Sequence, residues 1–185
     1  MPSANDLGNN MYIQEEFITD EDELLKFSSK ESWADQFQHQ TMWYEGWWKR
    51  EPENVWEETV RKIWEPLKVD QEKTHGFEFW INVLPTGGFL NWHQDKDEME
   101  ANDTGKVITP KKGTLYYPVP HVVSGGYLEV QNEQHEIERI APAFNRLIIF
   151  DSSLLHRVSP VYHGPRFVFI TNLWEEHTPK AFQPT

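Results

Sequence analysis

The spacing of apolar residues predicts that the first third of the chain is helical. Thr19 precedes three consecutive acidic residues and an apolar turn, which predicts a helix with Thr19 as its N-cap. A second helix is expected to begin near Pro52 and to end or kink at Pro66. Apolar side chains recur in it every three or four residues and should form one buried stripe, made of Val55, Trp56, Thr59, Val60, Ile63, Trp64 and Leu67.

From about residue 76 onward, short apolar runs bounded by Gly, Pro, Asn or Asp are typical of β-strands. The predicted strands cover residues 77–84, 114–119, 126–130, 136–140, 146–150 and 166–174. The runs 146–150 and 167–170 are apolar on both faces, so we expect them to lie between an opposing sheet and the helices. Since no helical pattern interrupts the strands, the sequence predicts a β-sandwich or barrel covered by the N-terminal helices.

We expect a single domain over residues 1–185, with a helical cover over 1–75 and a β core over 76–176. The segment 96–113 departs from this pattern, because it is polar and contains few apolar residues. A polar stretch of this length in a compact domain is either a functional lid or mobile loop, or a solvated insertion.

Composition narrows the chemistry that this chain can perform. The 185 residues include 30 Asp and Glu against 17 Lys and Arg, for a formal net charge of -13, and no cysteine. The lack of thiols excludes disulfides, thiolate-bound zinc, iron–sulfur clusters and cysteine nucleophiles, so any metal must be held by His, Asp or Glu. The charge argues against nucleic acid as a partner. The polar N-terminus and the lack of an apolar run near ~20 residues favour a soluble cytoplasmic protein without membrane contact.

His93 and Asp95 end a predicted strand and lie two residues apart. Residues with this spacing in a strand point to the same face, close enough to bind one cation. One more neutral nitrogen ligand would complete the 2-His-1-carboxylate arrangement of non-haem Fe(II) oxygenases. Taken alone, the pair is equally consistent with two solvated side chains at a strand end.

Two residues in the second half of the chain strengthen the metal interpretation. His156 follows the buried run 146–150, and Arg166 opens the next apolar strand ten residues later. A guanidinium inside a β core needs a carboxylate partner, and its planar fork suits bidentate binding of one. That partner is either an interior Asp or Glu, or a bound diacid.

With these residues in place, the stretch from about Ile81 to Trp174 resembles the Fe(II)/2-oxoglutarate-dependent dioxygenases, in particular their prolyl-hydroxylase-like branch. Five pieces carry the resemblance in the same order, namely residues 87–95, 114–117, 124–130, 142–150 and 156–166. The resemblance implies a mainly β fold. Its core would be a double-stranded β-helix (jelly roll) with the N-terminal helices packed on the major sheet.

The resemblance also implies the metal ligands. His93, Asp95 and His156 match the iron ligands of the family. Halogenating relatives replace the carboxylate with a small residue to admit chloride, so the presence of Asp95 favours hydroxylation. Asn172 stands where relatives often carry a large aromatic side chain, and we expect it to contribute a polar contact instead.

A cosubstrate pocket is implied by four further residues. Arg166 matches the residue that pairs with the distal carboxylate of 2-oxoglutarate, and Tyr117 matches a tyrosine that hydrogen-bonds the same carboxylate. Leu128 and Val158 match apolar walls of this pocket. One departure is Leu84, which stands where the family often has a tyrosine and removes a polar contact.

The implied reaction uses Fe(II), 2-oxoglutarate and O₂, with ascorbate as a supporting reductant. It hydroxylates an unactivated C–H bond of a prolyl, other peptidyl or small-molecule substrate and releases succinate and CO₂. The segments 96–113 and 42–48 are candidates for gating or substrate contact. Two alternatives stay open: a non-catalytic jelly-roll binding module, and a cupin-like metal-binding protein that does not need 2-oxoglutarate. The sequence decides neither the substrate nor the oligomeric state.

Overall fold

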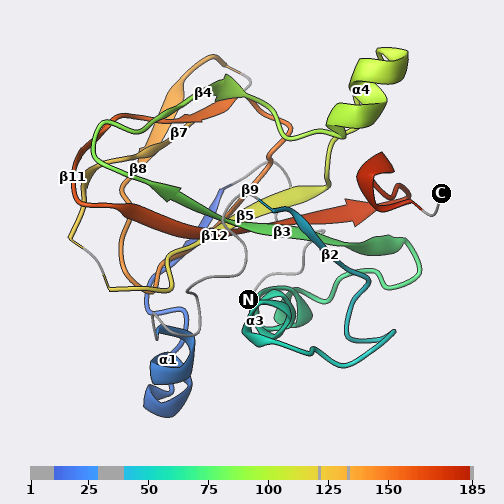
Figure 1. The fold of residues 1–185 in the computed structure, drawn as a ribbon, viewed down its shortest axis with the longest axis horizontal. Helices are drawn as coiled ribbons and strands as arrows, with labels where there is room; N and C mark the ends of the chain where they lie inside the picture. Colours follow the sequence, from blue (N-terminus) through green and yellow to red (C-terminus); the bar gives the residue numbers. More distant parts are fainter. Residues whose placement is uncertain (1–10, 29–39, 121, 133, 184–185) are drawn as a thin grey trace.

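Two antiparallel β-sheets lie face to face in the computed structural model, which describes residues 11–28, 40–120, 122–132 and 134–183 (Figure 1). The major sheet has the order β1 (Tyr12–Gln14), β9 (Leu147–Phe150), β5 (Lys112–Tyr116), β12 (Arg166–Glu175), β3 (Thr74–Leu84), β2 (Met42–Tyr44). The minor sheet has the order β4 (Leu90–His93), β10 (His156–Val158), β7 (Leu128–Gln131), β8 (Ile137–Ile140). A short ribbon pairs β6 (Ser124–Gly125) with β11 (Val161–His163). The predicted jelly-roll core is confirmed.

Helix α3 (Val55–Trp64) covers the outer face of the major sheet, below the strands in Figure 1. Asn54 caps its N-terminus, because the side-chain Oδ1 accepts two backbone N–H groups of the first turn at 3.1 and 3.0 Å. The α-helix stops where Pro66 enters the 3₁₀ turn η1 (Glu65–Leu67). The predicted helix end at this proline is therefore confirmed.

The contact between this helix and the sheet is made by buried aromatic side chains. Trp64 is fully buried, its ring lies 5.8 Å from that of Phe77 on β3, and its indole N–H donates to Thr171 Oγ1 on β12 at 3.3 Å. The shorter helix α1 (Glu21–Ser28) adds Phe27 to the same core. The predicted apolar stripe thus holds the helical layer on the sheet.

Strand β9 carries apolar side chains on both of its faces. Leu147 and Ile149 join the core beneath the helices, whereas Ile148 and Phe150 join the core between the two sheets. All four are buried, since a strand inside a covered sheet exposes neither face. This agrees with the position predicted from its unbroken apolar run.

The first third of the chain is not entirely helical, which corrects the predicted cover. It also contains β1 and β2, which form the two edges of the major sheet by pairing with β9 and β3. Each strand has only three residues, too few for an alternating pattern to show in the sequence. The predicted cap is also shifted by one residue. Helix α1 begins at Glu21, and the side chain that accepts the Glu23 amide, at 2.9 Å, is that of Asp20 rather than Thr19.

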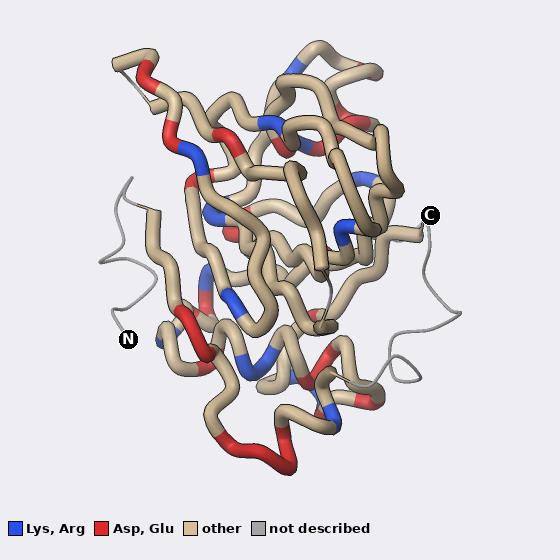
Figure 2. The backbone as a smooth tube through the Cα atoms, turned by 90° about the vertical axis from the view of Figure 1, so that its left-hand side faces the viewer, with Lys and Arg blue, Asp and Glu red and all other residues tan. Residues whose placement is uncertain are grey.

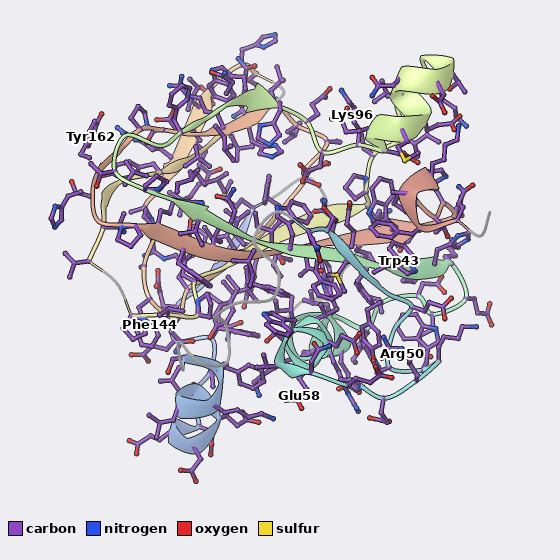
Figure 3. All side chains as sticks on the ribbon, viewed as in Figure 1. Trp43, Arg50, Glu58, Lys96, Phe144 and Tyr162 are labelled. Carbon is purple, nitrogen blue, oxygen red and sulfur yellow. The ribbon has the colours of Figure 1, made fainter. Side chains whose placement is uncertain are left out.

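The aromatic residues of segment 42–48 pack against the body of the protein. Trp47 stacks on Phe77 at 5.6 Å between ring centroids. Trp43, labelled in Figure 3, stacks on Phe182 of the C-terminal turn η2 (Lys180–Phe182) at 5.3 Å. These contacts give the aromatic side chains a packing role.

Segment 96–113 contains a short helix, α4 (Glu98–Thr104), where the sequence indicated a loop or insertion. Asp97 caps it by accepting the Glu100 amide at 3.0 Å. The other carboxylate oxygen of Asp97 accepts from His177 Nε2 at 2.8 Å and from the Lys180 amide at 2.7 Å. A single buried carboxylate therefore fastens α4 to the C-terminal residues.

Along the backbone, the Lys and Arg residues are interspersed with Asp and Glu residues (Figure 2). Several form ion pairs on the helical layer, for example Arg50 with Glu57 at 2.6 Å and Arg61 with Glu51 at 2.8 Å. Among the described residues, no helix is both long and apolar enough to span a bilayer.

We predict that Trp64→Ala lowers the free energy of unfolding by about 3–5 kcal/mol, because it opens a cavity between α3 and the major sheet. Urea denaturation followed by circular dichroism measures the change. Leu25→Ala on α1, where the leucine is 70% exposed, is the matched control and should stay within about 0.5 kcal/mol of the wild type. Equal losses of unfolding free energy in both variants would contradict the packing of Trp64 between α3 and the major sheet.

Candidate metal centre

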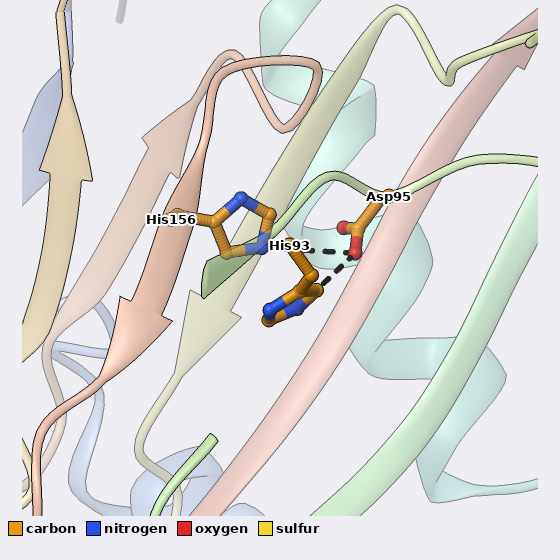
Figure 4. Close-up of side chains that lie close together, drawn as sticks. All are labelled: His93, Asp95 and His156. Atoms are coloured by element: carbon orange, nitrogen blue, oxygen red, sulfur yellow. Dashed lines mark ion pairs between the residues drawn. The ribbon is translucent and has the colours of Figure 1, made fainter. Parts of the chain in front are cut away.

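The antiparallel pairing of β4 with β10 brings His93 directly opposite His156. Asp95 follows β4 by two residues, and its backbone N–H donates to the Ser152 carbonyl at 3.0 Å. The loop after β9 thereby fixes the chain at Asp95. Figure 4 shows the three predicted ligand side chains converging from these segments.

The distances among the three side chains suit a single metal ion. Asp95 Oδ1 lies 3.9 Å from His93 Nε2 and 3.7 Å from His156 Nε2. One ligand atom from each residue lies within 4.8 Å of the other two, and no other such group of three occurs within the described ranges. Two imidazoles and one carboxylate are the donor set of a 2-His-1-carboxylate facial triad, which leaves positions open for other ligands.

Backbone carbonyls set the orientation of both imidazoles. His93 Nδ1 lies 2.7 Å from the Asn91 carbonyl, and His156 Nδ1 lies 2.9 Å from the Leu154 carbonyl. A carbonyl only accepts, so each Nδ1 carries a proton, and in the neutral imidazole the lone pair is then on Nε2. Both rings therefore have the tautomer that presents Nε2 to a metal.

Burial keeps the His156 imidazole in the form that a ligand needs. Burial lowers its pKa, the charge of Asp95 opposes this shift, and His93 adds to it. His156 is nearly enclosed, whereas the His93 side chain is 40% exposed. The centre therefore opens to solvent on the His93 side.

A cavity of about 80 Å³ lies beside the three ligands, between the two sheets. Arg166, at the start of β12, lines it and is completely buried. Its Nε donates to the Gly126 carbonyl at 2.9 Å, and its Nη2 donates to the Tyr117 hydroxyl at 3.0 Å. Among the described residues, no carboxylate oxygen lies within 4.0 Å of this guanidinium.

Gly126 makes room for the stem of this arginine. Its φ of +64° lies in the left-handed region, and an added Cβ would come within 2.9 Å of Arg166 Cδ. Its carbonyl also accepts the Arg166 Nε hydrogen bond. Glycine is therefore required here both by backbone conformation and by close approach.

The remaining predicted pocket residues lie around Arg166. Leu128 and Val158 line the cavity with it. Tyr117, which directly follows β5, contacts Arg166, whereas Tyr116 at the end of β5 points to the helical core. Leu84, directly across from Arg166 on β3, packs with Val158 in an apolar cluster and adds no polar group.

Asp95 has a second neighbour that the sequence indicated only as a polar contact. The Asn172 side-chain Nδ2 donates to Asp95 Oδ2 at 3.2 Å. Asn172 is 1% exposed and lines the same cavity. Because Oδ2 is engaged, Oδ1 remains as the oxygen facing both histidines.

Glu78 on β3 was missed by the sequence interpretation. It accepts from the Trp174 indole N–H at 3.0 Å and from Asn172. Burial raises its pKa to about 7; the charges of Asp95 and Asp97 add to this, and the two hydrogen bonds oppose it. Its position in the run Phe77-Glu78-Phe79 suggests a solvent-facing residue, and only the presence of a second layer shows otherwise.

Comparison with known proteins adds family and fold relationships to this geometry. The profile of the 2OG-Fe(II) oxygenase superfamily matches residues 79–174, which include all three ligands and Arg166. A PKHD-type hydroxylase of Pseudomonas fluorescens is 27% identical over 109 residues, which cover 57% of this chain and 48% of that protein. One from Hyphomonas neptunium is 31% identical over 90 residues, covering 49% and 39%. The chain therefore spans half or less of the length of these curated relatives.

Two solved structures share the fold. A Pseudomonas putida prolyl-4-hydroxylase superposes with a TM-score of 0.63 and 16% identity, covering 92% of this chain and 96% of that one. A prolyl hydroxylase from Trichoplax adhaerens, in complex with a hypoxia inducible factor peptide fragment, superposes with a TM-score of 0.64 and 18% identity, covering 98% and 91%. At these identities the likeness concerns the fold alone.

The raised pKa of Glu78 predicts a pH dependence of stability in the metal-free protein. Between pH 4.5 and about 7 the folded state holds a proton that the unfolded state releases, so stability present at low pH is lost as the pH rises. The loss is on the order of 2–3 kcal/mol. Glutamine resembles the protonated acid and does not titrate, so Glu78→Gln should lack this pH-dependent loss of stability.

Urea denaturation in the presence of a chelator, at pH 5 and at pH 8, tests this expectation. The difference in unfolding free energy between Glu78→Gln and the wild type should shift in favour of the variant at the higher pH. Glu138→Gln on the exposed face of β8 controls for the loss of one negative charge. Parallel pH profiles for the wild type and Glu78→Gln would contradict the prediction.

Proposed function

The chain belongs to the 2OG-Fe(II) oxygenase superfamily, and we propose that it is an Fe(II)- and 2-oxoglutarate-dependent hydroxylase. The reaction converts an unactivated C–H bond of a prolyl, other peptidyl or small-molecule substrate to C–OH and releases succinate and CO₂. One observation carries the proposal: a 2-His-1-carboxylate cluster and a fully buried arginine without a carboxylate neighbour among the described residues share one cavity.

His93, Asp95 and His156 are the proposed Fe(II) ligands. Neutral imidazoles and a carboxylate fit a divalent first-row metal, and three protein ligands leave sites for 2-oxoglutarate and O₂. Bound together, iron and 2-oxoglutarate supply the oxidising power that breaks an unactivated C–H bond. A carboxylate at position 95 occupies the site that a halide would need, which supports hydroxylation.

Arg166 is the proposed partner of the distal carboxylate of 2-oxoglutarate. A desolvated guanidinium is costly without a counter-charge, and a diacid that enters the cavity would provide one. The Tyr117 hydroxyl lies beside the same guanidinium and can donate to the same carboxylate. Leu128 and Val158 flank the path between arginine and metal and exclude water from it.

The substrate is proposed to approach from the side of His93. The His93 side chain is 40% exposed while His156 is buried, so the open face of the centre lies there. The segment from Lys96 through α4 follows directly and is a candidate for substrate contact. The prolyl hydroxylase from Trichoplax adhaerens, which shares the fold, is in complex with a peptide fragment, so peptides are the first substrates to test and small molecules the second.

We predict that Arg166→Met weakens 2-oxoglutarate binding to the Mn(II)-loaded protein about 10- to 100-fold, because hydrogen bonds to a charged carboxylate contribute about 1.5–3 kcal/mol. Anaerobic titration calorimetry measures the dissociation constant. Arg166→Lys keeps the charge but not the planar guanidinium, so its dissociation constant should lie between those of the wild type and Arg166→Met. Mn(II) affinity without 2-oxoglutarate is the control and should not change. Unaltered 2-oxoglutarate affinity in Arg166→Met would exclude the proposed cosubstrate site.

We predict that His93→Ala and His156→Ala each reduce Fe(II)-dependent succinate formation to background, because two ligands hold the metal poorly. The assay supplies Fe(II), 2-oxoglutarate, ascorbate and a panel of peptides and small molecules, and follows succinate by mass spectrometry. His163→Ala on β11, an exposed histidine, is the matched control. A normal succinate yield in the His93→Ala and His156→Ala variants would contradict the proposed hydroxylase activity. Uptake of O₂ in the absence of 2-oxoglutarate would indicate the cupin-like alternative.

A further inference from the structure

Asp95 has two carboxylate oxygens in unlike surroundings. Oδ1 faces the Nε2 atoms of both histidines at 3.7 and 3.9 Å. Oδ2 points toward β12 and accepts the Asn172 Nδ2 hydrogen bond at 3.2 Å. The carboxylate is thereby divided into one oxygen for the metal and one for the protein.

The orientation of the Asn172 amide follows from its neighbours. Its NH₂ group contacts two acceptors, Asp95 and Glu78. An amide oxygen turned toward the Asp95 carboxylate would repel it, so the NH₂ group faces Asp95. Glu78 is in turn held by the Trp174 indole N–H at 3.0 Å. A buried hydrogen-bonded chain therefore runs from Trp174 to the candidate metal ligand.

Gly113 provides the space that this arrangement needs. It is the cross-strand partner of Asn172 on β5. A Cβ at this position would lie 2.8 Å from Asn172 Oδ1 and 2.8 Å from Ser152 Cβ, and both neighbours are buried. Ser152 is also the residue whose carbonyl accepts the Asp95 N–H. Asn172 restrains the side chain of Asp95 and Ser152 restrains its backbone, and both residues lie next to Gly113.

We propose that Asn172 is a positioning residue that fixes Asp95 as a monodentate metal ligand through Oδ1, with Glu78 holding the amide and Gly113 leaving room for it. This rests on the metal site of the proposed function. A carboxylate free to turn could bind through both oxygens and take up a coordination position that 2-oxoglutarate or O₂ requires. The hydrogen bond to Oδ2 prevents that rotation, which is how a neighbour of a ligand tunes a metal site.

The test uses Asn172→Leu, which keeps the approximate volume and removes the donor. Two readouts that do not depend on turnover are measured on the full chain: the Mn(II) dissociation constant by titration calorimetry, and the d–d absorption of the Co(II)-substituted protein, which reports coordination number. Asn82→Leu is the matched control, because Asn82 lies on the same face of β3 as Glu78 by strand alternation and does not line the metal cavity.

We expect Asn172→Leu to weaken Mn(II) binding about 10- to 100-fold and to alter the Co(II) spectrum, since loss of a group that orients a ligand typically costs this much. Asn82→Leu should change neither readout. Thermal unfolding in a chelator is recorded for each variant, so that a purely structural effect is seen as a lower Tm with an unchanged dissociation constant and spectrum. That result would overturn the proposal.

A second variant keeps the proposal testable if the leucine variant does not fold. Asn172→Ser leaves a small polar side chain that is too short to reach Asp95, and it should show the same loss of affinity and the same spectral change. Wild-type values in the serine variant would overturn the positioning role. If the wild-type protein itself binds no Mn(II), the metal site of the proposed function fails instead, so the two failures are distinguishable.

Discussion

The pairing of β4 with β10 is the contact on which the candidate centre depends, since it sets His93 across from His156. The opposite face of the same strands is held by a row of side chains in strand order. The Arg157 guanidinium lies 4.8 Å from the ring of Trp92 and donates to Glu129 at 2.6 Å, and Glu129 also pairs with Arg139 at 3.2 Å. Because side chains alternate, this row restrains β4, β10, β7 and β8 from outside while the inner face remains available for a metal.

Strand β12 positions both ends of the cavity. Arg166 and Asn172 are six residues apart on the same face, so about 20 Å of one strand separates the cationic end from the end that contacts Asp95. The strand is paired on both sides, with β3 and β5, and its centre is buried. A rigid central strand is well suited to hold two groups at a fixed separation.

The candidate metal ligands and Arg166 could be predicted from the sequence, whereas fewer of the residues around them could. His93 and Asp95 could be proposed as ligands from their two-residue spacing and the family resemblance, and Arg166 from the cost of burying an unpaired guanidinium. Glu78 could not, because a glutamate between two phenylalanines shows the alternation of a half-exposed strand, and the layer covering it comes from elsewhere in the chain. Strand ends shifted by two or three residues, as in β5, which covers Lys112–Tyr116 rather than 114–119. Strands begin and end where their pairing partners do, and these partners lie far away in the sequence.

The buried guanidinium of Arg166 also links folding to ligand supply. A charge enclosed without a counter-ion among the described residues raises the free energy of the ligand-free fold, and a diacid that neutralises it lowers that free energy by mass action. On the proposed function, the folded population then rises with the concentration of the keto acid. Such a protein would be more persistent in cells rich in that metabolite and more readily degraded when it is scarce.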